Sequence, residues 1–195
     1  MKSLLLFWTI LLFHGCEKYK SNKEIQINIP DEIVKINKKV LIYVPSKKIE
    51  LKKKIKSSSC NSSDLNLSIE KPYRTALLRL FNKMFDDFSI TNKKIVNTEI
   101  YENYYSYIEV IPSDVYSIFY TENKIGKFFS KFSLSLVVQN NSKKFENRIL
   151  EENSWKKNVY FDCDLSKGAN ISIQIGIDKA LSKLHLFLFN SLKKL

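Results

Sequence analysis

The chain has 195 residues, of which 44% are hydrophobic and 13% aromatic, and its formal net charge is +12. This composition excludes a disordered chain, and four glycines with four prolines are too few for a sandwich built of many tight turns. The positive charge favours anionic partners, namely phospholipid head groups, lipid A phosphates or nucleic acid. An AT-rich genome can also produce a lysine-rich surface, so the charge alone does not establish a function.

The first sixteen residues are typical of a secretory leader. Lys2 supplies a positive charge, an apolar run follows from Leu4 to Phe13, and the segment ends at Gly15 and Cys16. About ten apolar residues suit the hydrophobic region of a signal peptide and fall short of the roughly twenty that a membrane-spanning helix requires. A small residue directly before a cysteine resembles a bacterial lipobox, in which the cysteine is lipidated and becomes the mature N-terminus.

This leader defines the expected organisation of the chain. Residues 1–15 form the signal peptide, residues 16–30 hold the lipidated Cys16 and a polar tether, and residues 31–195 form a single α+β domain. The mature protein is then held in the bacterial cell envelope by its lipid and faces the periplasm, with the outer membrane preferred over the inner. The alternatives are an ordinary cleaved signal, which gives a secreted protein, and an uncleaved anchor. A secretory leader argues against nucleic acid as a partner.

Two short segments after the tether predict strands. Val40–Val44 is a compact apolar run that ends at Pro45, as expected of a central strand. In residues 47–56 apolar and charged positions alternate, which predicts a strand with one wet face. This face could contact phosphate groups of an anionic lipid through Lys47, Lys48, Lys52, Lys53, Lys54 and Lys56. The alternative is an edge strand that its lysines protect from aggregation.

The spacing of apolar residues predicts a helix from Pro72 to about Phe88, with the proline in the first turn. From Ile100 the period changes to two. Strands are expected at Tyr107–Ile111, at Val115–Tyr120 as a second strand or a continuation past Pro112, from Phe128 to Val138, and at Phe145–Leu150. Turns are expected at Thr121–Gly126 and at Asn140–Ser142, and Trp155 borders a polar loop.

A closing helix is expected over residues 170–194. Its apolar seam consists of Ile173, Ile177, Leu181, Leu184, Leu188 and Leu192. The beginning is ambiguous, because the isoleucines from 171 to 177 also alternate strictly, as in a strand. Leu186, Phe187 and Phe189 widen the apolar surface, so the helix is either deeply buried or contacts a partner or a membrane.

Few side chains could carry catalysis or bind a metal. His14 leaves with the signal, and His185 is expected to be a core or boundary residue of the Leu- and Phe-rich closing helix rather than a catalytic base. One histidine and two distant cysteines are too few for a metal site. Cys60 and Cys163 form an even pair that could close a disulfide in an oxidising compartment. A tyrosine cluster either forms an interface or covers the sheet edge or a loop, and it consists of Tyr101, Tyr104, Tyr105 and Tyr107.

The order of these elements resembles small bacterial envelope lipoproteins. YajG-like lipoproteins share the Ile-rich entry, the strand, a helix similar to Arg74–Phe88, the meander and the closing helix. LptE-type lipopolysaccharide-assembly lipoproteins share much of this order and a basic surface. The resemblance implies an α+β fold with one mainly antiparallel sheet of about four to five strands packed by two helices.

We therefore expect a non-enzymatic, membrane-anchored lipoprotein that uses no cofactor and contacts another envelope protein as an assembly or transport accessory. One alternative is a lipid- or lipopolysaccharide-binding assembly lipoprotein, which would use the lysines of residues 47–56 or the apolar surface of the last helix. The other is a secreted binding protein without an anchor. A eukaryotic secreted protein would carry glycans on Asn61 or Asn66.

Overall fold

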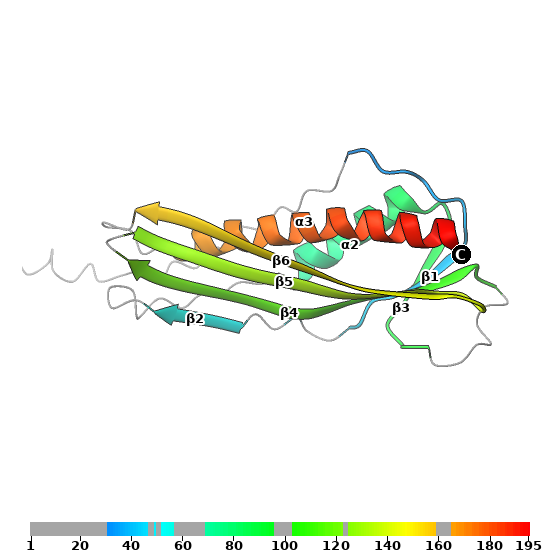
Figure 1. The fold of residues 1–195 in the computed structure, drawn as a ribbon, viewed down its shortest axis with the longest axis horizontal. Helices are drawn as coiled ribbons and strands as arrows, with labels where there is room; N and C mark the ends of the chain where they lie inside the picture. Colours follow the sequence, from blue (N-terminus) through cyan, green and yellow to red (C-terminus); the bar gives the residue numbers. More distant parts are fainter. Residues whose placement is uncertain are drawn as a thin grey trace, which may run out of the picture.

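A computed structural model describes residues 31–46, 49, 52–56, 69–95, 103–122, 125–158 and 165–195. The described residues form one mixed sheet and two helices (Figure 1), which confirms the predicted α+β fold. The expected signal peptide, Cys16 and the tether lie outside the described residues, and so do Cys60, Cys163, Lys47 and Lys48.

The sheet has the strand order β3-β1-β4-β5-β6, and β2 pairs with β4 beside this path. The strands are β1 (Val40–Tyr43), β2 (Lys52–Lys56), β3 (Phe88–Thr91), β4 (Ser106–Glu122), β5 (Ile125–Gln139) and β6 (Lys144–Asn158). The pairs β4-β5 and β5-β6 are antiparallel, as predicted. The pairs β3-β1, β1-β4 and β2-β4 are parallel, which the sequence did not predict. Parallel neighbours require a crossover, and helix α2 (Glu70–Met84) lies in the connection between β1 and β3.

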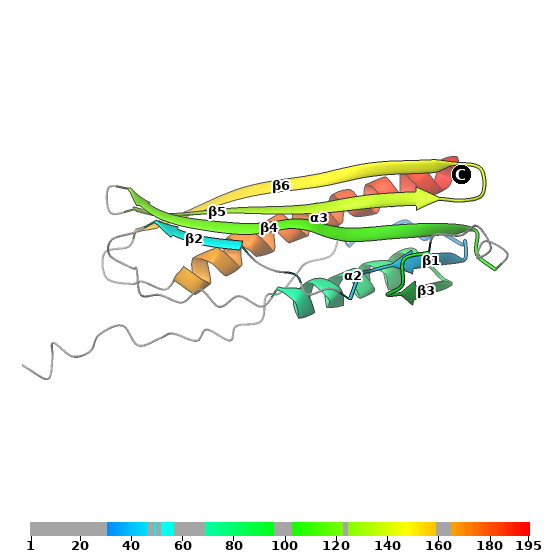
Figure 2. The ribbon, with the colours of Figure 1, turned by 90° about the horizontal axis from the view of Figure 1, so that it is seen from below.

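The two short parallel strands lie one after the other along the same edge of β4. β1 pairs with Ser106–Glu109, at the beginning of β4, whereas β2 pairs with Tyr116–Tyr120, near its end. The other edge of β4 is occupied by β5 along nearly its whole length. The long hairpin of β4 and β5, extended by β6, is therefore the frame on which both halves of the sheet are built (Figure 2).

The long strands confirm one of the two alternatives given for the meander and correct two predictions. β4 passes Pro112 as one strand, with a shift of register between Pro112 and Asp114, so the two expected segments are continuous. The turn predicted at Thr121–Gly126 is shorter, because Thr121 pairs with Gly126 inside the hairpin. Trp155 does not border a loop but lies within β6, which continues well past the predicted end at Leu150 and pairs with β5 throughout. The turn at Asn140 is confirmed, and its Oδ1 accepts hydrogen bonds from the backbone N–H groups of residues 142 and 143.

The first helix ends earlier than its apolar spacing predicts. Pro72 lies in the first turn, as expected, but α2 ends at Met84. Phe85 is extended and forms a bridge with Ile36, and Phe88 begins β3, which pairs with β1. The phenylalanines at 85 and 88 thus continue the helical spacing in sequence while the backbone has already joined the sheet. Pairing with a distant strand overrides a local pattern that is compatible with both structures.

The closing helix α3 (Leu165–Lys194) is helical over the region where a strand was the alternative. Its predicted seam is confirmed, because every one of the six residues from Ile173 to Leu192 is buried in the core. Both helices lie on the same face of the sheet (Figures 1 and 2), and α3 packs against β5, β6 and α2. The core between them also takes Tyr73 and Phe81 from α2 and Phe132 from β5, each with at most 1% of its surface exposed.

Candidate interaction surface

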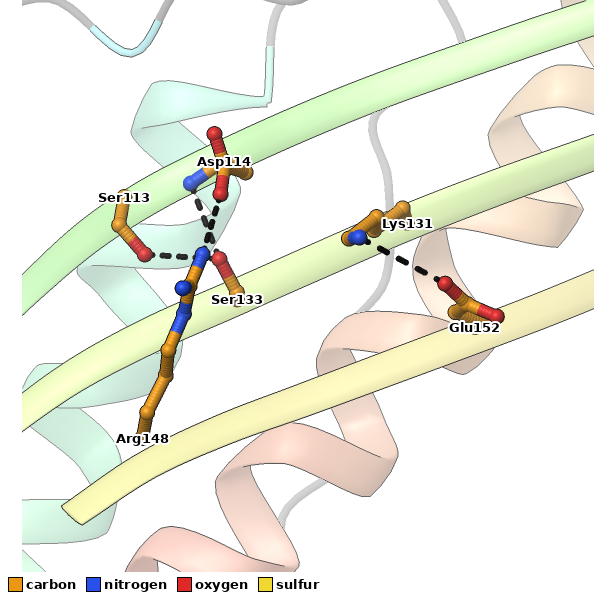
Figure 3. Close-up of polar contacts among 6 residues, drawn as sticks. All are labelled: Ser113, Asp114, Lys131, Ser133, Arg148 and Glu152. Atoms are coloured by element: carbon orange, nitrogen blue, oxygen red, sulfur yellow. Dashed lines mark hydrogen bonds and ion pairs between the residues drawn. The ribbon is translucent and has the colours of Figure 1, made fainter.

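The two faces of the long strands differ in what covers them. On the helix-covered face, the even-numbered residues of β5 from Phe128 to Val138 are all buried. On the other face, which we call the open face, most odd-numbered residues of β5 are partly exposed, and in the described part of the chain no helix covers them (Figures 2 and 3). This confirms the predicted half-buried strand with one solvated side. On the open face, side chains of β4, β5 and β6 lie side by side and can act together.

We divide the open face by the short strand that lies beside it. The β1 half comprises the open-face residues of β4 up to Asp114 and the open-face residues of β5 and β6 that pair with them, within Ser133–Gln139 and Lys144–Leu150. Lys94 is counted with this half because it forms an ion pair with Glu109. The β2 half comprises the open-face positions Tyr116, Ile118, Tyr120, Glu122, Ile125, Lys127, Phe129, Lys131, Glu152, Ser154, Lys156 and Asn158.

In the β1 half, three basic side chains each form an ion pair with a carboxylate. Lys94 Nζ lies 3.0 Å from Glu109 Oε2, and Arg148 Nη2 lies 2.5 Å from Asp114 Oδ2 (Figure 3). Lys144 forms an ion pair with Glu146, which raises the pKa of the lysine and lowers the pKa of the carboxyl. The positive and negative charges of this half therefore largely cancel locally.

The bulge of β4 lies at the boundary between the halves and is held by side-chain hydrogen bonds. The backbone N–H of Asp114 donates to Ser133 Oγ at 3.0 Å, and the hydroxyls of Ser113 and Ser133 are 2.7 Å apart (Figure 3). Ser133 is buried, although it points away from the helices. These contacts satisfy backbone and hydroxyl groups where the register shifts, so we assign them a structural role.

The β2 half combines aromatic rings with lysines. The rings of Tyr116 and Phe129 pack edge to face, with centroids 5.9 Å apart, and Tyr120 is 37% exposed with Lys127 Nζ 5.7 Å from its ring centroid. Lys131 Nζ lies 3.6 Å from Glu152, and Lys156 is exposed. Among the described side chains of this half, cations outnumber carboxylates.

Strand β2 brings further lysines to the same half. Its register pairs Lys52 with Tyr116, Lys54 with Ile118 and Lys56 with Tyr120. Paired residues of neighbouring strands occupy the same face of a sheet, so these three positions belong to the open face. Lys53 pairs with Ser117 and occupies a position of the opposite face. Of the six lysines predicted to contact anionic lipid, the register thus brings three together beside the rings of β4.

Of the described tyrosines of the cluster, Tyr107 lies inside the sheet, in β4 between β1 and β5, and Tyr104 and Tyr105 precede this strand. Tyr107 is 2% exposed and its hydroxyl accepts a hydrogen bond from the backbone of Ile95, and burial raises its pKa to about 12, with Glu109 contributing. Lys38 Nζ lies 3.8 Å from the ring centroid of Tyr105, and Lys39 Nζ lies 5.3 Å from that of Tyr104. Tyr101 lies outside the described residues. Tyr107 thus belongs to the core, whereas Tyr105 is 39% exposed.

His185 is a core residue, as predicted, and not an accessible base. It is 8% exposed, its Nε2 has no hydrogen-bond partner, and burial lowers its pKa. Within the described ranges, no group of three or more His, Cys, Asp or Glu side chains could hold a metal ion. Among the same residues, neither helix is both long enough and apolar enough to cross a membrane. The apolar surface expected on the last helix is reduced to Leu186, which is 56% exposed, because Phe187 and Phe189 pack against the core.

Sequence reasoning missed the contribution of β4, β5 and β6 to the β2 half. Strict alternation places Lys127, Phe129 and Lys131 on one face of β5, so this part could have been found from the pattern. The position of β2 beside the second half of β4 could not, because it depends on parallel pairing between segments about 60 residues apart in the chain.

The fold is thus that of an α+β protein in which a long three-stranded hairpin system is covered on one face by two helices. No protein-family model and no curated protein sequence matches this chain. Among solved structures, a Xanthomonas campestris protein of the DUF330 family is similar with a TM-score of 0.46 and 5% identity, over 88% of this chain and 95% of that one.

Two further structures show similar agreement. A putative neuraminyllactose-binding hemagglutinin homolog from Helicobacter pylori gives a TM-score of 0.42 and 11% identity, over 92% of this chain and 99% of that one. A minor lipoprotein from Acinetobacter baumannii gives a TM-score of 0.39 and 10% identity, over 77% of this chain and 90% of that one. At TM-scores below 0.5, these similarities do not place the chain in a family.

Proposed function

We propose that this chain is a lipid-anchored protein of the bacterial cell envelope, that it is not an enzyme, and that it acts through contacts with another envelope protein as an assembly or transport accessory. The observation that carries the proposal is the leader, in which a short apolar run ends at Phe13 and is followed by His14, Gly15 and Cys16. A run of this length fits the hydrophobic region of a cleaved signal, and the cysteine then provides the site for a lipid.

The described domain supports a role in binding rather than catalysis. His185 would be the histidine remaining in the mature chain, and it is buried in the core, where it is poorly placed to take a proton from a bound substrate. By contrast, β6 lies at the end of the sheet and is 15 residues long. A strand edge of this length offers backbone donors and acceptors to a partner strand, while its alternating charges protect it against self-association.

Metabolic labelling with radioactive palmitate tests the anchor. We expect the wild-type chain to incorporate label and the Cys16→Ala variant to incorporate none. A second readout is the distribution between the membrane and soluble fractions, which should shift toward the soluble fraction in the variant. A wild-type chain without label would contradict the anchor.

The protein contact is tested separately, by affinity purification of the lipidated chain from its own envelope. We expect one envelope protein to copurify in near-stoichiometric amount and to be lost when residues of β6 on its outer edge are altered. Recovery of the chain alone would contradict the accessory role and leave the anchor unaffected.

A further inference from the structure

We propose that the β2 half of the open face binds the surface of an anionic phospholipid bilayer, so that the domain lies against the membrane that holds its anchor. The proposal rests on the proposed function in one respect, since the anchor is what keeps the domain near that membrane. It goes further by naming the surface and the ligand, which are phosphate-bearing lipid head groups.

The β2 half gathers positive charge. Lys127, Lys131 and Lys156 surround the rings of the β2 half, and the register of β2 adds the positions of Lys52, Lys54 and Lys56. Against these six lysines stand the carboxylate of Glu152, which lies beside Lys131, and the position of Glu122, which pairs with Ile125 at the end of β4. Each lysine close to an anionic membrane strengthens binding by about fivefold, so such a group attracts the domain strongly at low salt.

Partly exposed apolar side chains lie between the lysines. Tyr116 and Phe129 are in edge-to-face contact, Ile118 is the register partner of Phe129, and all three are partly exposed. Aromatic side chains with one polar end are enriched at the depth of lipid head groups, and lysine stems extend along apolar surface while their ammonium groups stay in water. The arrangement thus offers a shallow apolar centre for the head-group region within a positive border.

The composition favours a membrane over an acidic protein as the occupant. The cores of protein interfaces are depleted of lysine and enriched in arginine, which forms forked hydrogen bonds with carboxylates. The positive residues named in the β2 half are all lysines, and the arginine of the open face, Arg148, lies in the β1 half, where Asp114 binds it. Lysines act as point charges and suit the diffuse field of many mobile head groups.

Cosedimentation with vesicles tests the proposal. The protein used is the mature chain from residue 16 with Cys16→Ser, which lacks the lipid and retains every described residue. We expect it to bind vesicles that contain phosphatidylglycerol and not vesicles of phosphatidylcholine alone, and to be released as salt rises from about 0.1 M to about 1 M.

Two triple variants with the same loss of formal charge provide the matched comparison. Lys127→Gln with Lys131→Gln and Lys156→Gln alters the β2 half, and Lys94→Gln with Lys144→Gln and Arg148→Gln alters the β1 half. We expect the first to weaken binding on the order of 100-fold and the second less than about fivefold. Circular dichroism melts of both variants separate lost binding from lost folding, and the β2 set Lys52→Gln, Lys54→Gln and Lys56→Gln gives an independent route to the same loss.

A variant that keeps the charge tests the rings. Phe129→Ser should weaken vesicle binding on the order of tenfold, because it removes apolar surface from the centre of the site. Equal losses in the two triple variants, or equal binding to neutral vesicles, would overturn the proposal. So would binding to poly-glutamate or to lipopolysaccharide micelles that is tighter than binding to phosphatidylglycerol vesicles at equal anionic charge.

The vesicle and palmitate results are independent. If vesicle binding fails while palmitate labels Cys16, the surface is wrong and the anchor stands. If labelling fails while the unlipidated chain binds vesicles as described, the anchor is wrong and the surface stands.

Discussion

The two faces of β5 show how one strand serves two purposes. Phe128, Phe132 and Leu134 pack under the helices and are almost fully buried, whereas Phe129 and Lys131, which alternate with them, lie on the open face among other partly exposed side chains. Because successive side chains of a strand point to opposite faces, stability and binding are assigned to neighbouring residues. A substitution at one residue should therefore affect folding, and a substitution at the next should affect binding.

The largest expected difference between the faces is in the stability lost when Phe132 or Phe129 is replaced by alanine. Phe132→Ala removes a ring that is 1% exposed and in edge-to-face contact with Tyr73, 5.5 Å between centroids, so it should lower the free energy of unfolding by about 3–5 kcal/mol. Phe129→Ala removes a partly exposed ring and should cost about 1 kcal/mol. Urea denaturation of the mature chain measures both. Equal losses would contradict the division between the faces.

The next effect concerns how closely α3 approaches the sheet. A Cβ on Gly168 would lie 2.4 Å from Phe128 Cε2 and 2.7 Å from Trp155 Cζ3, whereas a Cβ on Gly176 would meet Phe132 Cβ at an ordinary 3.8 Å. Gly168→Ala should therefore destabilise the protein by about 1–3 kcal/mol, because the two rings must move.

Gly176→Ala is the matched control in the same helix. It should stabilise the protein by about 0.5–1 kcal/mol, since alanine is the better helix former and space is available. Thermal melts of the two variants should shift in opposite directions. If both variants melt above the wild type, the packing of the helix N-terminus against β5 and β6 is looser than described.

A smaller effect on the covered face depends on pH. Burial holds the pKa of His185 below its usual value, so near neutral pH the unfolded chain binds more protons at this residue than the folded chain does. Stability is then fully present above the unfolded pKa of about 6.5 and is lost as pH falls below it. The His185→Leu variant should show a flatter dependence of unfolding free energy between pH 8 and pH 5.5 in urea titrations. An unchanged slope would assign the pH dependence to other groups.

How far an element could be predicted from the sequence depends on whether local or distant interactions form it. The seam of α3 and the alternation in β5 depend on local periods, and both were predicted correctly. The predicted end of α2 was wrong because Phe85 and Phe88 join the sheet through distant partners, Ile36 and Val40. The same limit applies to the candidate surface. Its lysines in β2 were recognised from their spacing, but the rings and lysines beside them are brought there by the parallel pairing of β2 with β4.

The most direct test of the account locates the membrane contact on the open face. Two open-face serines serve as labelling sites, Ser154 in the β2 half and Ser135 in the β1 half, each replaced by cysteine in a mature chain whose other cysteines are serine. An environment-sensitive fluorophore on each reports contact with phosphatidylglycerol vesicles. The account predicts a blue shift and stronger emission at position 154 and little change at position 135. Equal shifts at the two positions, or a shift at position 135 alone, would contradict it.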